Sequence, residues 1–92
     1  MFKELDGFTR TYKVSEKYNV EVQLVDVDEP DERYEAWIFN PNICYKLFMF
    51  GMPTYQQDYD EFLEYVMDEW TDYTSEYEDM ATERRKENEH GN

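Results

Sequence analysis

The sequence is short of cysteine, glycine and basic residues, and each shortage excludes a class of protein. Its 92 residues include one cysteine, Cys44, which excludes an internal disulfide framework and favours a reducing compartment. The three glycines are far apart and form no phosphate-binding loop. The opening residues MFKELDGFTR lack the apolar segment of a secretory signal, and the longest apolar run, residues 47–52, is too short to span a bilayer. We therefore expect a cytoplasmic protein.

Residues suited to catalysis are also scarce. The single histidine, His90, lies near the end of the chain in a segment predicted to fray, which gives a general base no scaffold. Carboxylates are abundant, but on an exposed helix they are solvated, and nothing singles one out for acid catalysis. We therefore expect a protein that is not an enzyme and that needs no cofactor or metal.

Negative charge is what the chain has in excess. It has 23 acidic and 9 basic residues, for a formal net charge of −14, and 40% of its residues are hydrophobic and 18% aromatic. Disordered acidic chains contain few aromatic residues, so this chain is expected to fold, and its length suits one domain over residues 1–92. Residues 47–92 hold thirteen of the acids and three of the bases, so the second half carries most of the charge.

Alternating side chains predict four antiparallel strands within about residues 8–50. The segments FTRTYKV and VEVQL alternate apolar and polar residues, apart from Arg10, and the SEKYN between them suits a hairpin. YEAWIF and ICYKLFMF predict two more strands, joined by a tight turn at residues 40–42. Strands in meander order form the simplest sheet. The fourth segment is apolar on both faces, so we expect it to be interior or covered.

A long C-terminal helix is predicted over about residues 55–86, with a frayed tail at residues 87–92. Thr54 and Gln57 have the spacing of a capping box, and the bases at residues 84–86 complement the negative end of the helix dipole. At 100° per residue one side of this helix is apolar and is expected to pack on the sheet. That side contains Tyr55, Tyr59, Phe62, Leu63, Val66, Met67, Trp70, Tyr73, Tyr77 and Met80. The predicted fold class is therefore α+β, an antiparallel sheet of three to four strands packed by one long amphipathic acidic helix.

The aromatic residues are assigned two roles. Those predicted to fill the space between sheet and helix are Trp37, Phe39, Phe48, Phe50 and Trp70. Side chains of the third and fourth strands that one helix cannot cover would leave an apolar patch on the outer face of the sheet. Such a patch marks a partner site or a homodimer interface. The segment FGMP, residues 50–53, is the expected apolar anchor beside the acidic side of the helix.

The opposite side of the predicted helix carries acids without neutralising bases. Residues 58–79, DYDEFLEYVMDEWTDYTSEYED, contain ten carboxylates and no lysine or arginine. Eight acid pairs lie at i,i+3 or i,i+4 spacing and together cost about 2–4 kcal/mol. A helix of this length spans about 33 Å, so its carboxylates are spaced by roughly 3.3 Å, close to the phosphate spacing of a nucleic-acid strand. The partner-binding residues predicted on the helix are Asp58, Glu61, Glu64, Tyr65, Asp68, Glu69, Asp72, Glu76 and Asp79.

A second acidic segment, DVDEPDE at residues 26–32, marks a loop. Hard cations such as Ca²⁺ bind several such oxygens, but the spacing lacks the glycine and final glutamate of an EF-hand, and Pro30 interrupts it. A solvated turn, a weak cation site and a second acidic contact patch remain open alternatives. The residues assigned to that second patch are Asp28, Glu29, Asp31 and Glu32.

In its charge pattern the chain resembles the small acidic DNA-mimic inhibitors of bacteriophages and mobile elements. These include anti-CRISPR proteins, anti-restriction proteins and inhibitors of uracil-DNA glycosylase. The resemblance rests on residues 58–79 and, less strongly, on residues 26–32. It implies an inhibitor in a bacterial host cell whose carboxylates replace phosphates in the basic site of a CRISPR effector, restriction enzyme or other nuclease, with anti-CRISPR activity favoured. Direct binding to nucleic acid or membrane is not expected for so acidic a chain.

Two other interpretations of the acidic side remain. One is the solvated face of an ordinary amphipathic helix. The other is a non-mimic interaction module, such as an immunity protein that covers a basic nuclease toxin. An immunity protein would bind a single toxin and need not follow the geometry of DNA.

Overall fold

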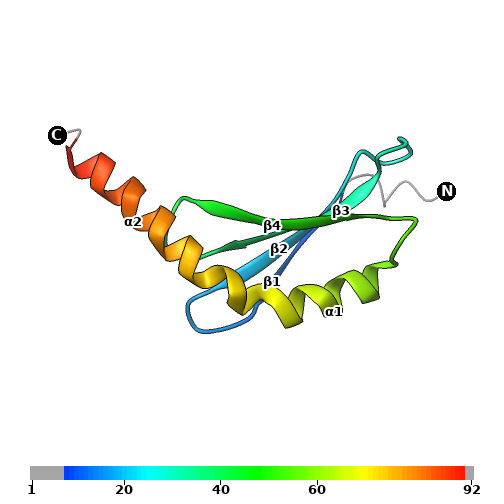
Figure 1. The fold of residues 1–92 in the computed structure, drawn as a ribbon, viewed down its shortest axis with the longest axis horizontal. Helices are drawn as coiled ribbons and strands as arrows, with labels where there is room; N and C mark the ends of the chain where they lie inside the picture. Colours follow the sequence, from blue (N-terminus) through cyan, green and yellow to red (C-terminus); the bar gives the residue numbers. More distant parts are fainter. Residues whose placement is uncertain (1–7, 91–92) are drawn as a thin grey trace.

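The computed structural model describes residues 8–90 of the protein, with side chains described over residues 8–83. One antiparallel sheet has its strands in sequence order: β1 (Thr9–Lys13), β2 (Asn19–Val25), β3 (Arg33–Phe39) and β4 (Lys46–Pro53). A helical arm follows, made of α1 (Tyr59–Glu69), the 3₁₀ turn η2 (Trp70–Tyr73) and α2 (Thr74–His90). The arm lies along one face of the sheet, and α2 runs on past the end of the strands (Figure 1). The predicted α+β fold with a meander sheet is confirmed.

Arg10 fits β1 although it breaks the apolar alternation. Its register partner on β2 is Val22, which is fully buried under the arm. The Arg10 guanidinium lies over the rings of Phe8 and Tyr59, 5.0 and 5.5 Å from their centroids. A cation over aromatic rings is favourable, and the long side chain keeps its charge at the solvated edge of the core.

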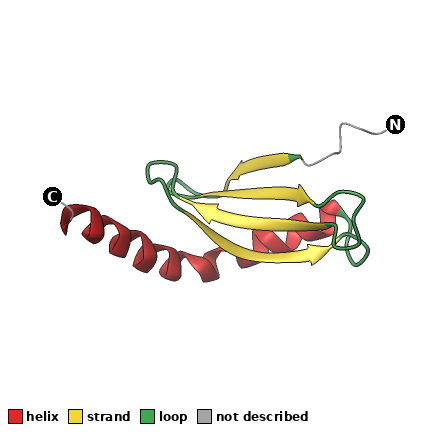
Figure 2. Cartoon of the chain, turned by 90° about the horizontal axis from the view of Figure 1, so that it is seen from above, coloured by secondary structure: helices red, strands yellow, loops and turns green. Residues whose placement is uncertain are grey.

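β4 differs from its prediction in both boundary and position. It begins at Lys46, three residues later than predicted, because residues 40–45 form a turn in which the Ile43 N–H donates to the Asn40 carbonyl at 2.9 Å. It is also an edge strand rather than an interior one. The arm covers one face of β4, and the other face belongs to the open side of the sheet (Figure 2).

A bulge explains why β4 looks apolar on both faces. Between the register pairs Ala36–Phe50 and Trp37–Phe48, Met49 is an extra residue in the strand. Met49 is 6% exposed, and Phe50 beside it also packs against the core. Two neighbouring residues therefore turn toward the arm, which a strictly alternating strand does not allow.

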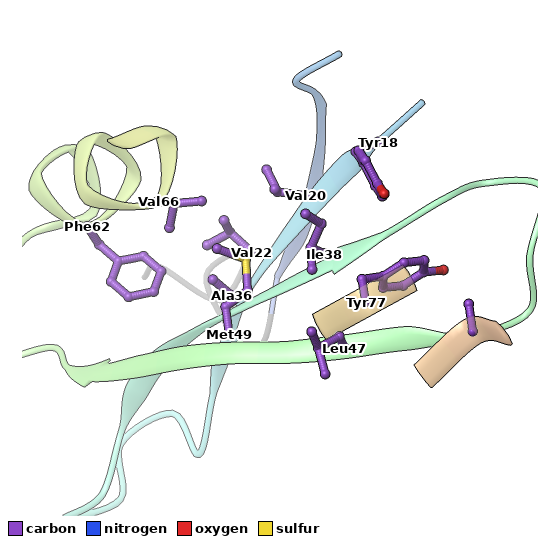
Figure 3. Close-up of a cluster of buried hydrophobic side chains, with 11 residues drawn as sticks. Tyr18, Val20, Val22, Ala36, Ile38, Leu47, Met49, Phe62, Val66 and Tyr77 are labelled. Carbon is purple, nitrogen blue, oxygen red and sulfur yellow. The ribbon is translucent and has the colours of Figure 1, made fainter. Parts of the chain in front are cut away.

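The core lies between the sheet and the arm (Figure 3). Its buried members are Tyr18, Val20, Val22, Ala36, Ile38, Leu47, Met49, Phe62, Val66, Tyr77 and Ala81. From the arm, Phe62, Val66 and Tyr77 are fully buried, so they attach α1 and α2 to the sheet. Burying one such side chain contributes roughly 1.5–3 kcal/mol.

Two of the aromatic residues predicted for this core lie elsewhere. Trp37 lies between Ala36 and Ile38, which are both fully buried under the arm, so strand alternation turns Trp37 to the outer face of the sheet. Its register partner Phe48 shares that face and is 45% exposed. The prediction was wrong for Trp37 and Phe48. Of the other predicted residues, Phe50 and Trp70 pack against the core, and Phe39, which strand alternation places on the outer face with Trp37, is half-buried and also contacts it.

α1 begins at Tyr59, four residues later than predicted. Its N-cap is Asp58, whose carboxylate accepts from the Glu61 N–H at 2.9 Å, while the Glu61 carboxylate accepts from the Asp58 N–H at 3.3 Å. Thr54 does not cap the helix and instead donates to the Glu32 carboxylate at 2.5 Å. Both residue pairs have capping-box spacing, and the negative N-cap also complements the helix dipole.

The 3₁₀ turn η2 interrupts the predicted apolar stripe. The 100° spacing of an α-helix is not kept through such a turn. Beyond it, Tyr77 and Ala81 are buried against the sheet, while Met80 is 40% exposed. Met67 is 36% exposed, and Tyr55 precedes the helix and is 79% exposed. The prediction that Tyr55, Met67 and Met80 pack on the sheet was wrong.

α2 extends further than predicted. Its helical backbone continues to His90, into the segment predicted to fray, and residues 91–92 lie outside the described part of the chain. The side chains of the bases at residues 84–86 also lie outside it. Within residues 8–90, no helix has the length and apolar character needed to cross a membrane.

Candidate partner-binding surface

The arm carries most of the uncompensated charge. Residues 58–83 contain eleven acids and no lysine or arginine, whereas residues 8–57 contain eight acids and five bases. Among the ion pairs of residues 8–83, one reaches the arm, between Lys17 and Glu78 at 2.9 Å. Side chains of this part of the protein therefore leave most of the charge of the arm unneutralised.

α1 presents its acids to solvent. Glu61, Glu64 and Asp68 follow one another at helical spacing on the side away from Phe62 and Val66, and all three are exposed. They form the first part of what we call the acidic row.

α2 carries the second part of the acidic row. Asp72 in η2 and then Glu76, Asp79 and Glu83 in α2 are spaced by three or four residues, and all are exposed. The acidic row thus runs along the arm from Glu61 to Glu83, with the N-cap carboxylate of Asp58 ahead of it. It retains solvent access along both helices.

Two open grooves border the acidic row on α1. One is lined by Gln56, Gln57, Glu61, Glu64, Tyr65 and Asp68. The other is lined by Asp58, Asp60, Glu61, Leu63, Glu64 and Met67. Glu61 and Glu64 belong to both, so they form the ridge between the grooves. Gln57 Oε1 in the first groove is buried and has no hydrogen-bond donor among the described residues.

Tyr65 places an aromatic ring at the first groove. Its ring centroid is 4.8 Å from that of Phe50, and the residue is 39% exposed. The ring is therefore held against β4 while part of it still reaches solvent. Phe50 itself packs into the core, so the segment FGMP does not present this ring as the exposed anchor expected from the sequence.

Glu69 is the acid of the arm with the least favourable environment for charge. It is partly buried at the end of α1. Burial raises its pKa, and a hydrogen bond with Asp72 and repulsion from Asp72 and Asp68 raise the pKa further. Glu69 therefore marks a point where carboxylates are crowded at the junction of α1 and η2.

The loop at residues 26–32 is partly neutralised from within. Arg33 forms ion pairs with Asp26 at 2.6 Å, with Asp31 at 3.7 Å and with Glu35 at 2.9 Å. Asp26 and Asp28 have left-handed backbone conformations, with φ of 54° and 66°, which aspartate tolerates better than most residues. The loop therefore folds around Arg33 and presents less free charge than its sequence indicates.

Glu32 has its own internal partners. Its carboxylate accepts hydrogen bonds from the Thr54 hydroxyl and from the Asp28 N–H, and these two bonds lower its pKa. Glu29 and Asp28 have exposed side chains. In the described residues, no group of three His, Cys, Asp or Glu side chains is arranged to hold a metal ion. Of the predicted loop contacts, Asp28 and Glu29 are thus the two most available to a partner.

This surface suits cationic groups. Carboxylates accept strong hydrogen bonds from guanidinium and ammonium ions, and an aromatic ring such as that of Tyr65 attracts the same cations. No protein family, curated protein sequence or solved structure matches this chain. The charge and geometry of the surface are therefore the grounds on which a function is proposed.

The sequence prediction missed three polar residues that line the grooves, and it assigned two apolar lining residues, Leu63 and Met67, to the sheet-facing side of the helix. Asp60 lies four residues before Glu64, so helical spacing was enough to find it. Gln57 had been assigned to a helix cap, and Gln56 lies just before the helix. Their place in the groove depends on the true helix start at Tyr59, which the sequence left ambiguous.

Proposed function

We propose that the protein is a DNA-mimic inhibitor that occupies the basic nucleic-acid-binding site of a bacterial defence nuclease, with a CRISPR effector as the favoured target. The observation that carries this proposal is the acidic row, because it is long, has one sign of charge and lies on a helix fixed to a sheet. A merely soluble surface mixes both signs of charge. Here the bases of residues 8–83 all lie in the sheet and its loops.

The dimensions of the arm support mimicry. Residues 58–83 span about 39 Å along a helix, comparable to the 34–36 Å of one turn of duplex DNA. Over this length the arm has eleven carboxylates, and the buried side chains of Phe62, Val66 and Tyr77 hold it on the sheet. A rigid row is pre-organised, so less conformational entropy is lost on binding than with a flexible acidic tail.

Arginine side chains of the target are the expected contacts. A guanidinium entering the first groove meets the carboxylates of Glu64 and Asp68 and the ring of Tyr65. Arginines that normally bind phosphates or base edges have the same donors available for carboxylates.

The proposal is tested by competition for DNA. A panel of CRISPR effectors, restriction enzymes and toxin nucleases is incubated with labelled DNA and increasing amounts of the protein, and the bound DNA is measured at several salt concentrations. A target is expected to lose its DNA in a competitive manner, with an affinity for the protein that falls steeply as salt rises. Binding to one toxin nuclease without competition for DNA would support the immunity-protein alternative instead.

Two variants that each remove three negative charges distinguish the effect of where the charges lie from the effect of the net charge. The triple variant Glu64→Gln, Asp68→Gln, Asp72→Gln removes three charges from the acidic row and is expected to abolish inhibition. A second variant removes three charges from the other predicted contact patch through Asp28→Asn, Glu29→Gln and Asp31→Asn, and it is expected to lose less because Arg33 already neutralises part of this loop. Unchanged inhibition by the first variant, or equal loss in both, would contradict the proposal.

A further inference from the structure

The sheet has an outer face that the proposed function does not use, and the acids on it are paired with bases: Glu21 with Lys46, and Glu35 with Arg33. Residues 36–57 contain no aspartate or glutamate and one base, Lys46, in a chain with 23 acids. These residues form most of β3, all of β4 and the turns beside β4. Seen from the side opposite the arm, the strands lie in front and no other described element covers them (Figure 2).

Aromatic side chains lie at the centre of this open face. The rings of Trp37 and Phe48 meet edge to face, with centroids 5.2 Å apart, and Phe48 is 45% exposed. Phe39 lies next along β3, and the Lys46 ammonium is 5.0 Å from its ring centroid. An apolar surface left open on a monomer is a common sign of an interface.

An ion pair with a buried carboxylate adjoins the aromatic rings. Glu21 on β2 is opposite Trp37 in register, faces the open side and is 7% exposed. Its carboxylate accepts from the Lys46 ammonium at 2.5 Å, and the side chain of Lys46 is 50% exposed. Because this carboxylate is neutralised within the chain, two copies can bring their apolar centres together here without a strong repulsion between unpaired acids.

We infer that this open face binds a second copy of the chain about a two-fold axis. In such a pairing the Trp37–Phe48 rings of the two copies meet, and each Lys46 keeps its ion pair with Glu21 of the same copy. Two chains of net charge −14 repel each other in most orientations. Back-to-back pairing through this face, whose acids are paired with bases, keeps both arms on the outside, where their acidic rows are furthest apart.

The interface is small, and the dimer is expected to be weak. Four strands about 4.8 Å apart and some seven residues long cover roughly 400 Å² in projection, which is below the area of a standard stable interface. Dimerisation should therefore depend on concentration in the micromolar range or above. This inference does not depend on the proposed function, because the acidic row stays exposed in either state.

The test is the mass of the protein in solution as a function of concentration and salt. Sedimentation equilibrium of the full chain is expected to move from 11.4 kDa toward twice that value as concentration rises. Raising NaCl from about 0.05 to about 0.5 M shortens the Debye length from about 14 to about 4 Å. This change is expected to strengthen dimerisation, because salt screens the repulsion between the two acidic chains. Binding to a basic target weakens with salt, so the two kinds of association respond in opposite directions.

Variants locate the contact. Phe48→Lys is expected to weaken dimerisation at least tenfold, although the added positive charge lowers the repulsion between copies. Met80→Lys makes the same change of charge at a similarly exposed position on α2 and is expected to leave the dimer intact or slightly stronger.

In a Trp70→Phe background, Trp37 is the sole tryptophan, and its fluorescence emission is expected to shift to the blue with increasing protein concentration. A protein that stays at 11.4 kDa under all these conditions, or a dimer that Phe48→Lys leaves unchanged, would overturn the inference.

Discussion

The Tyr77 hydroxyl donates a hydrogen bond of 2.7 Å to the backbone carbonyl of Tyr45. The same hydroxyl oxygen accepts from the Asn40 N–H at 3.0 Å, and Tyr77 is fully buried. Because Tyr77 belongs to α2 while Tyr45 and Asn40 flank the turn before β4, these bonds fix the second helix of the arm to the sheet. Together with the buried Ala81, Tyr77 therefore helps to set the position of the second part of the acidic row.

Tyr77→Phe is expected to lower the free energy of unfolding by about 1–3 kcal/mol. The change removes the hydroxyl that accepts from the buried Asn40 N–H and donates to the Tyr45 carbonyl. Urea denaturation followed by circular dichroism measures the loss. Tyr55→Phe is the control, because Tyr55 is 79% exposed and its hydroxyl faces water. Equal stability of Tyr77→Phe and the wild type would contradict the anchoring role.

Asp58→Ala is expected to destabilise the protein by about 1 kcal/mol, because the first turn of α1 loses its N-cap. Asp58→Asn keeps a capping oxygen and is expected to lose much less. The same urea experiment distinguishes them. If Asp58→Asn and Asp58→Ala lost equal stability, the negative charge rather than the capping bond to Glu61 would be the stabilising feature.

Glu69→Gln is expected to stabilise the protein at neutral pH. The pKa of Glu69 is higher in the folded protein than in the unfolded chain, so its contribution to stability is full below the unfolded pKa and is lost as pH rises through the folded pKa. The variant lacks the charge that is crowded by Asp72 and Asp68. Its melting temperature should exceed that of the wild type at pH 7, and the difference should shrink toward pH 3.5. A variant that is less stable at pH 7 would contradict the raised pKa.

The triple variant that removes Glu64, Asp68 and Asp72 is expected to be more stable than the wild type while losing its partner. Six of the eight close acid pairs of residues 58–79 include one of these residues, so the gain is about 1–3 kcal/mol at low salt. Urea denaturation at low and high NaCl measures it, and the gain should fall as salt screens the repulsion. A variant that loses both stability and binding would show a structural defect instead.

Local patterns were sufficient for the element order of this fold. Alternation of apolar and polar residues located the first two strands, two apolar segments joined by a turn located the other two, and the 3.6-residue period located the arm, because each signal is contained within a short stretch of sequence. The choice of N-cap was ambiguous, since Thr54–Gln57 and Asp58–Glu61 have the same spacing. The tertiary hydrogen bond between Thr54 and Glu32 decided it.

The face on which each aromatic residue lies was harder to predict. Trp37 and Ile38 are adjacent and both apolar, so the sequence WIF does not reveal which of them turns to the arm. The bulge at Met49 then shifts the alternation of faces in β4, and the 3₁₀ turn shifts the helical period along the arm.

Exposure of the acidic row was predictable because ionised carboxylates stay solvated. The ion pair between Arg33 and Asp26 was not predictable, because it depends on the left-handed backbone conformations of Asp26 and Asp28, which the sequence does not determine.

The separation of charge between sheet and arm gives a single copy a large electric moment. All five bases of residues 8–83 lie on the strands and their loops, whereas eleven of the nineteen carboxylates of these residues lie on the arm. Near a positive surface such a molecule experiences a torque that turns its helices forward before contact, which shortens the search for a productive encounter. In two copies joined back to back the moments oppose each other and the torque disappears. Association between copies would then slow the capture of a target even though every carboxylate remains accessible.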